Sequence, residues 1–250
     1  MMTNYLFYPI YSIIQGVTEF IPVSSSGHLN ILEILINKSY SRNLLHETTA
    51  HMGSLLALFL YLYKNDHFSK NNVSSNFIPI TLATIPAIIV GLGLILLQID
   101  FVSIRLIGIT SIVGAILLYI SDIKIFHKIK IDNPIIKFFI AGLFQCLAFL
   151  PGFSRSGSCI IAFRLLGETR KSSSIKSLYL GVPIILLSFI SNIRNLEEIS
   201  YDLNLLMIFF ITFITAYLTL IFFINFINKI GFKPFIIYRI ILGLIILIMF

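Results

Sequence analysis

Long apolar stretches separated by short polar loops run along the whole chain. They occupy residues 6–21, 28–37, 48–63, 78–97, 104–121, 134–150, 157–166, 176–193, 204–224 and 235–250. About 20 apolar residues in a helix cross the hydrocarbon core of a bilayer, and backbone in lipid must satisfy its own hydrogen bonds. The pattern therefore predicts an all-α integral membrane protein in which residues 1–250 form a single polytopic membrane domain.

Composition and charge agree with this prediction and exclude other classes of protein. The chain has 250 residues, of which 57% are hydrophobic and 12% are charged, whereas soluble chains carry about 25% charged residues. The net charge of +7 comes from basic residues in short loops, which is typical of membrane orientation signals and not of a nucleic-acid surface. Cys146 and Cys159 lie in apolar stretches and indicate neither a disulfide framework nor a metal site.

The loop charges predict an orientation. One predicted side of the membrane carries twelve basic residues: Lys64, Lys70, Lys124, Lys128, Lys130, Lys137, Arg164, Arg170, Lys171, Lys176, Lys229 and Lys233. The other side carries four, Lys38, Arg42, Arg105 and Arg194. Because cytoplasmic loops are enriched in lysine and arginine, the first set is expected in the cytoplasm.

With this orientation, two stretches must enter the membrane and return on the same side. Residues 134–166 would do so from the cytoplasm, with the turn at PGFSRSG, and residues 6–37 from the outside, with the turn at PVSSSG. The prediction is six transmembrane helices plus two oppositely directed re-entrant helical hairpins in an inverted repeat, a layout in which broken helices meet near the midplane.

Polar side chains gather at the first break. Gln15 and Glu19 are four residues apart and share a helix face. The serines, glycine and histidine that follow Pro22 are Ser24, Ser25, Ser26, Gly27 and His28. A helix beginning here would offer free N–H groups to an anion, and Ser25 lies close enough to His28 for a hydroxyl to meet a base. The alternative is that Glu19 forms a structural ion pair and the serines only cap a helix.

Arg155 lies between Ser154 and Ser156 at the second break. A permanent charge at membrane depth needs an anionic partner, and a guanidinium binds phosphate in a bidentate fork. A pair with Glu19 is compatible with a phosphate site. Other polar residues are weaker candidates. His51 either faces the cavity or bonds nearby backbone, Gln145 and Cys146 are interpreted as packing residues, and Tyr238 and Arg239 are expected near a helix end, where arginine usually extends to the interface.

These groups suit phosphoryl transfer, in which catalysis rests on positioning and charge stabilisation. Ser25 would attack, His28 would take its proton, and Arg155 with helix N–H groups would hold the developing charge. Glu19 and Gln15 would hold a divalent cation. Ser24 or Ser26 as the nucleophile, or a metal-bound water, remain alternatives. A site inside the membrane implies a lipid substrate.

Two segments, GVTEFIPVSSSGHL and QCLAFLPGFSRSG, resemble the signature motifs of the undecaprenyl-diphosphate phosphatase family of the bacitracin-resistance type. HMGSLLAL, TIPAIIVG, GVPIIL and KPFIIYR resemble further family segments in the same order, so the similarity covers essentially the whole chain.

The resemblance implies hydrolysis of undecaprenyl diphosphate to undecaprenyl phosphate and inorganic phosphate, which recycles the lipid carrier of cell-wall synthesis and confers bacitracin resistance. It also implies a Mg or Ca cofactor and a bacterial inner-membrane location with the site open to the outer face. It places catalysis at Ser25, His28, Glu19 and Arg155. It places substrate binding at Ser24, Ser26, Gly27, Ser154 and Ser156, and the metal at Glu19 and Gln15. The chain departs from the family pattern at Gln15, where glutamate is common, and at Cys159, where threonine is usual.

Two rival functions fit parts of the pattern. An inverted repeat with broken helices is also a transporter layout, so movement of a lipid phosphate across the bilayer is the alternative function. Transport requires Arg155 and a cavity but not Ser25. A structural membrane protein would leave Glu19 and Arg155 unexplained. The acid-phosphatase-like lipid phosphatases need a late arginine followed by histidine, and no histidine follows His127.

Overall fold

The structure, a computed structural model, describes residues 2–36, 44–65, 70–99, 103–123, 131–194 and 203–250. Within these ranges all regular secondary structure is helical: α1 (Met2–Thr18), α2 (Ser25–Ile36), α3 (Leu44–Lys64), α4 (Lys70–Leu96), α5 (Ile104–Ser121), α6 (Pro134–Gln145), the 3-10 turn η2 (Cys146–Phe149), α7 (Arg155–Leu165), α8 (Arg170–Arg194), α9 (Leu203–Ile230) and α10 (Lys233–Met249). The expected all-α class is confirmed.

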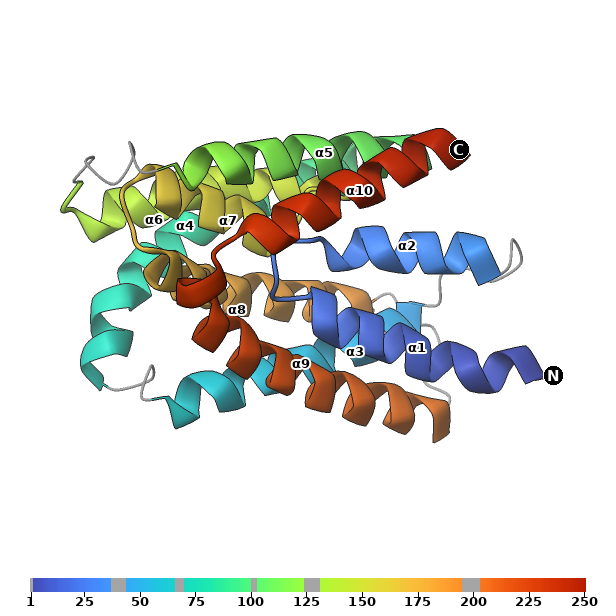
Figure 1. Ribbon diagram of the computed structural model, residues 1–250. Helices are drawn as coiled ribbons and strands as arrows, with labels where there is room; N and C mark the ends of the chain where they lie inside the picture. The colour runs from blue at the N-terminus through green and yellow to red at the C-terminus, as the bar shows by residue number, and fades with distance from the viewer. Residues whose placement is uncertain (1, 37–43, 66–69, 100–102, 124–130, 195–202) are drawn as a thin grey trace.

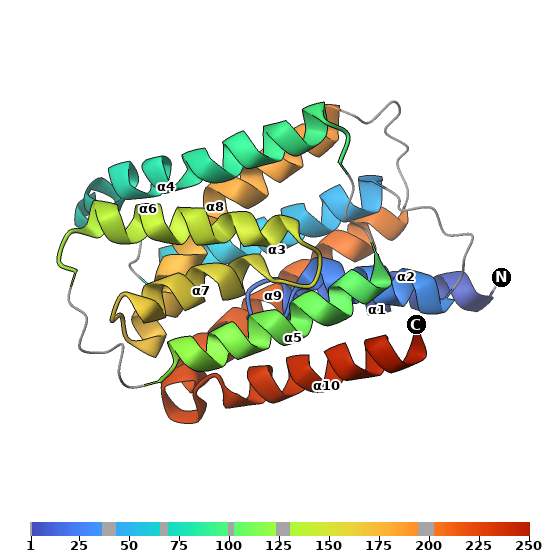
Figure 2. The ribbon, with the colours of Figure 1, turned by 90° about the horizontal axis from the view of Figure 1, so that it is seen from above.

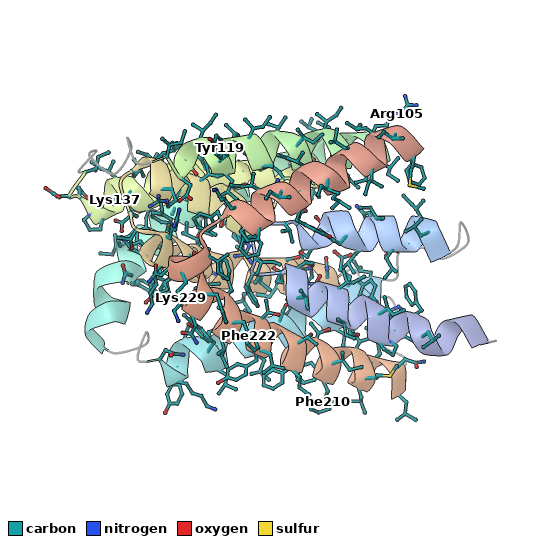
Figure 3. The ribbon with its side chains drawn as sticks, in the orientation of Figure 1. Arg105, Tyr119, Lys137, Phe210, Phe222 and Lys229 are labelled. Carbon is teal, nitrogen blue, oxygen red and sulfur yellow. The ribbon has the colours of Figure 1, made fainter. Side chains whose placement is uncertain are left out.

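Several helices are long and apolar enough to cross a bilayer. By length and composition these are Asn76–Leu96, Ile104–Ser121, Arg170–Asn192 and Leu203–Ile230. Many large apolar side chains point outward, among them Phe210 and Phe222 on α9, which are 55% and 59% exposed (Figure 3). Because lipid is the solvent that such a surface tolerates, the chain is a multi-pass membrane protein.

Two helical hairpins enter the bundle from opposite ends (Figure 1). α1 and α2 lie at the end that holds both termini, and α6 and α7 come from the other end. Figure 2 shows the same opposition from above. α2, α6 and α7 have 12, 12 and 11 residues. At 1.5 Å per residue each is roughly 18 Å long, well short of a hydrocarbon core of about 30 Å. Each hairpin therefore turns inside the bundle.

The two turns have matching backbone geometry. The first turn (residues 19–24) ends at Ser24 and the second turn (residues 150–154) ends at Ser154, and both serines have a φ of 78°. Each hydroxyl accepts a hydrogen bond from the N–H of a glycine three residues later, Gly27 at 3.3 Å and Gly157 at 3.1 Å. Both predicted breaks are therefore present, and each starts a new helix with a serine cap.

Glycines allow the hairpins to pack closely against long helices. A Cβ at Gly16 on α1 would collide with Thr215 on α9, and a Cβ at Gly142 on α6 would collide with the backbone of Ala83 on α4. Small residues at such contacts let helix backbones approach in a membrane, where apolar burial provides no driving force between helices. The first arm of each hairpin is thus held against a long helix.

Charged residues are divided between the two ends of the bundle. Lys137 and Lys229 lie at one end and Arg105 at the other (Figure 3). The predicted orientation also used Lys124, Lys128, Lys130, Lys38 and Arg42, which lie outside the described residues. Arg164 lies in the last turn of α7, beside the loop that it was expected to flank, and is 1% exposed. It donates to Asp122 at 2.9 Å, at the end of α5, and this carboxylate compensates the buried guanidinium.

Glu168, between α7 and α8, organises the lysine-rich end. Its carboxylate accepts hydrogen bonds from Lys137, Lys176 and Ser172, each at 2.6 Å. Burial raises the pKa of this carboxyl, but the two ammonium groups and the hydroxyl outweigh burial and bring the pKa down to about 2. Glu168 thus joins the starts of α6 and α8 at this end of the bundle.

Candidate functional site

The first and second turns meet at one cavity of about 180 Å³. Its lining comes from both turns and from α2, α3, α4, α6, η2, α7 and α8: Glu19, Ser24, Ser25, Ser26, His51, Ala87, Gln145, Ala148, Phe149, Ser154, Arg155, Ile184, Ile185 and Ser188. α2 and α7 both begin here, so the positive ends of two helix dipoles lie at the same cavity. The cavity is therefore suited to an anionic group.

Glu19 is the centre of the polar contacts at this cavity. Its Oε1 accepts from Arg155 Nη2 at 3.0 Å, which joins the first turn to α7. Its Oε2 accepts from Ser25 Oγ at 2.8 Å and from Gln15 Nε2 at 3.0 Å. The predicted pairing of Glu19 with Arg155 is present, and the carboxylate also contacts the serine expected to act as nucleophile.

The remaining serines of the two turns build the site and connect its halves. Ser24 and Ser154 act as helix caps, and their hydroxyls lie 3.4 and 3.2 Å from those of Ser26 and Ser156. Ser156 Oγ also donates to the Ile21 carbonyl at 2.9 Å, across the interface of the two turns. Among these serines, Ser25 is distinguished by its direct hydrogen bond to Glu19.

His28 points away from Ser25. Its Nδ1 lies 2.6 Å from the Ser24 carbonyl, and its Nε2 lies 2.6 Å from the Tyr238 hydroxyl on α10. The His28 and Tyr238 rings are stacked, with centroids 5.6 Å apart. Both ring nitrogens are therefore engaged, and the structure does not bring His28 to the Ser25 hydroxyl as the spacing suggested.

His51 and Gln145 line the site, although their sequence context made both of them weak candidates. His51 lines the cavity, and its Nδ1 lies 3.3 Å from Gln15 Nε2. Gln145 is 2% exposed and also lines the cavity, so a ligand-binding role stands beside the predicted packing role. Cys159 Sγ donates to Gln145 Oε1 at 3.4 Å, while Gln145 Nε2 has no hydrogen-bond partner in the described structure. The sequence signal for a role in the site was a glutamine in an otherwise apolar helix.

The position of Arg239 differs from the prediction. The expected position was a helix end with the side chain extended to the interface, but the residue is 0% exposed. Its guanidinium contacts backbone carbonyls of both turns, including Pro22 at 3.1 Å and Phe153 at 2.9 Å. Its burial depends on Gly114 of α5, where a Cβ would collide with the guanidinium. Contacts across 86 or more residues leave no local signal in the sequence.

The residues around Gln15 fit a hard divalent cation only in combination with a ligand. Gln15 Oε1 is buried and has no hydrogen-bond partner in the described structure, and Glu19 supplies a carboxylate beside it. The described residues hold no group of three or more His, Cys, Asp and Glu arranged for a metal. Magnesium commonly takes one or two carboxylates plus phosphate oxygens of its substrate. The donor set fits that mode.

A second, smaller cavity adjoins the first and shares Ser25, Ser26 and His51 with it. Its other lining residues are Tyr11, Gln15, Leu29, Asn30, Glu33 and Glu47. They lie along α1, α2 and α3, toward the end of the bundle that holds the termini. The polar groups around Glu19 thus continue toward the end opposite Lys137 and Lys229.

Comparison with known proteins decides the family. A family model described as bacitracin resistance protein BacA matches residues 8–245. The chain belongs to the BacA family. Among curated BacA relatives, it is 35% identical over 256 residues to an undecaprenyl-diphosphatase of Pelagibacter ubique, covering 99% of this chain and 98% of the relative. A protein of the same name from Campylobacter curvus is 32% identical, covering 96% of this chain and 97% of the relative. One from Prochlorococcus marinus is 34% identical, covering 98% of each chain.

Proposed function

We propose that this BacA-family chain hydrolyses undecaprenyl diphosphate to undecaprenyl phosphate and inorganic phosphate. The observation that carries the proposal is the hydrogen-bonded series Ser25–Glu19–Arg155, which combines a hydroxyl, a carboxylate and a guanidinium at one cavity. Membership of the family and the similarity to proteins named undecaprenyl-diphosphatase support it. The apolar outer surface keeps the lipid tail of such a substrate in the bilayer, and loss of the activity would sensitise cells to bacitracin.

Ser25 acts as the nucleophile in this proposal. Its Oγ attacks the terminal phosphorus while Glu19 Oε2, 2.8 Å away, takes the hydroxyl proton. The bond from that phosphorus to the bridging oxygen breaks, and undecaprenyl phosphate leaves with the electron pair. Water then hydrolyses the phosphoserine and releases inorganic phosphate. Glu19 replaces His28 as the proposed base because both His28 nitrogens have other partners.

Arg155 and the starts of α2 and α7 hold the phosphate oxygens. The guanidinium pairs with Glu19 in the free protein and is positioned to bind the diphosphate with its remaining N–H groups. The first-turn N–H groups of both helices lack intrahelical partners and add hydrogen bonds to the same anion. A divalent cation held by the side-chain oxygens of Gln15 and Glu19 would supply further neutralisation of the diphosphate charge.

The finer membrane arrangement is also part of the proposal. Six helices cross the bilayer, α3, α4, α5, α8, α9 and α10, and the hairpins α1–α2 and α6–α7 are re-entrant from opposite sides. Matching φ values at Ser24 and Ser154 support an inverted repeat. The lysine-rich end faces the cytoplasm by the positive-inside rule. The second cavity then continues to the outer face of a bacterial inner membrane.

The test is phosphate release from a polyprenyl diphosphate by the purified protein in detergent, with magnesium or calcium and with a chelator. Ser25→Ala is expected to lower kcat by at least about 10³-fold, because the nucleophile is removed. Ser54→Ala is the matched control, since within the described part of the chain the Ser54 hydroxyl donates to a carbonyl of its own helix, that of His51 at 3.0 Å. Lipid-phosphate transport without release of phosphate would contradict the proposal, and full hydrolysis by Ser25→Ala would refute the nucleophile.

A further inference from the structure

Arg239 is a fully buried arginine whose described guanidinium contacts are all with backbone carbonyls. It extends from α10 and is 0% exposed. Its Nε donates to Ser111 at 3.2 Å, its Nη1 donates to Pro22 at 3.1 Å, and its Nη2 donates to Gly152 at 3.2 Å, Phe153 at 2.9 Å and Thr110 at 3.4 Å. A charge buried at this depth is costly unless dipoles compensate it, so these carbonyls must be held in place around it.

The carbonyls come from three parts of the chain that are distant in sequence. Pro22 belongs to the first turn, and Gly152 and Phe153 belong to the second. The other two carbonyls belong to α5. One rigid planar group therefore fixes the first turn against the second. A lysine has its donors on a single nitrogen and cannot reach carbonyls on several sides at once.

The neighbouring helices make space for this contact. A Cβ at Gly114 on α5 would collide with Arg239 Nη2, and a Cβ at Gly157 on α7 would lie 3.2 Å from Nη1. Gly114 thus provides the space through which the side chain passes α5 to reach the turns. The preceding residue, Tyr238, contacts His28 in the first helical turn of α2. Two adjacent residues of α10 therefore contact the elements that build the site without lining the cavity.

The groups of the proposed reaction are divided between the turns that Arg239 joins. Ser25 and Glu19 belong to the first side of the site, and Arg155 belongs to the second. Arg239 does not line the cavity, so it is placed to act through the backbone and not on the substrate. A shift of about 1 Å between reacting groups can cost about 10²-fold in rate.

We propose that Arg239 is a positioning residue that holds the two turns in register, so that Glu19 and Ser25, in and directly after the first turn, meet Arg155, directly after the second. This inference rests on the proposed hydrolysis. If this is correct, replacing Arg239 by a side chain without a guanidinium slows the chemical step more than it impairs folding or substrate binding.

The experiment compares Arg239→Lys and Arg239→Met with Arg164→Lys. Arg164 is the matched control because it is also a buried arginine, 1% exposed, but it bonds Asp122 and the Glu168 carbonyl near the lysine-rich end. Thermal unfolding in detergent and steady-state kinetics are measured below the melting range of every variant. Both Arg239 variants are expected to lose about 10²-fold in kcat with a much smaller change in KM. Arg164→Lys is expected to lower the melting temperature while kcat stays close to that of the wild type.

Wild-type kcat in a folded Arg239→Lys or Arg239→Met protein would overturn the inference. If both variants fail to fold, Gly114→Ala tests it with the arginine retained, because the added Cβ displaces the guanidinium. Gly93→Ala is its control, since a Cβ there meets no heavy atom of the described chain within 4 Å. Gly114→Ala should lower kcat by at least about tenfold, and wild-type kcat in this variant would refute the inference.

Failure of the proposed function gives a different result. In that case the wild-type protein itself releases no phosphate, whatever residue 239 is. The positioning role is then judged by hydrogen exchange of the backbone amides of the two turns, residues 19–24 and 150–154, which requires no catalysis. Faster exchange of both turns in Arg239→Lys than in Arg164→Lys would support the joining of the two turns, and equal exchange would refute it.

Discussion

Gln15→Glu tests how the site holds a cation, because it changes one of the two proposed cation ligands from a neutral amide to a carboxylate. Gln15 Nε2 lies 3.0 Å from Glu19 Oε2, so the variant places a second carboxylate against the first. At an effective dielectric constant of about 20, two unit charges 3.0 Å apart repel each other by about 5 kcal/mol. The pair must therefore share a proton, separate, or bind a cation.

A divalent cation relieves this repulsion and gains a charged ligand in place of a neutral one. We expect the concentration of magnesium that gives half-maximal phosphate release to fall at least about tenfold, since a tenfold change requires only about 1.4 kcal/mol. Without metal, the variant should unfold at a lower temperature than the wild type, and magnesium should restore much of the difference.

The assay is a magnesium titration of phosphate release, with thermal unfolding followed in chelator and in magnesium. Gln145→Glu is the matched control, because it adds the same charge to the first cavity, which Glu19 also lines, from the α6 side and without the Gln15–Glu19 contact. An unchanged magnesium requirement in Gln15→Glu, or an equal tightening in Gln145→Glu, would show that Gln15 and Glu19 do not hold the cation.

Three further predictions concern other parts of the protein. Arg155→Lys should lower kcat/KM for a polyprenyl diphosphate by about 10²-fold or more, since an ammonium cannot form the bidentate fork; near-normal kinetics would contradict a phosphate-binding role. Gln145→Leu should raise KM at least about tenfold if the unpartnered Nε2 binds the diphosphate, whereas an unchanged KM would return Gln145 to a packing role. Glu168 has a pKa lowered from 4.5 to about 2, so its ionised form contributes up to about 3 kcal/mol of stability above pH 4.5, and this is lost as pH falls toward 2. Melting temperatures of wild type and Glu168→Gln should therefore converge over that range, and a constant difference would contradict the assigned pKa.

Much of the fold was predictable because membrane spans are coded locally. A run of apolar residues predicts a helix wherever it occurs, and the breaks at Pro22 and Pro151 interrupt two such runs with residues that start helices. The pairing of Glu19 with Arg155 was predictable as well, because two isolated opposite charges in an apolar chain stabilise each other. None of these inferences needed knowledge of which helices pack together.

The unpredicted features depend on helix rotation and on distant contacts. Ser25 and His28 are three residues apart, but Ser25 is the first residue of α2 and turns back to Glu19, while His28 faces α10. Arg239 looked like an interfacial arginine because its local sequence shows nothing of Gly114, whose missing side chain admits the guanidinium. Spacing along one helix does not specify the neighbour that each face meets.

The contact between Pro22 and Arg239 bears on how the protein matures in the cell. These residues are 217 positions apart, so the first hairpin enters the membrane long before the helix that supports its turn has been made. Synthesis proceeds from the N-terminus, and contacts of such large sequence separation form late. Ser24 holds a left-handed backbone conformation that persists only when its surroundings enforce it. Nascent chains that lack α10 should therefore insert into the bilayer yet remain inactive. Phosphatase activity should appear only when α10 has been synthesised and packed against the first turn.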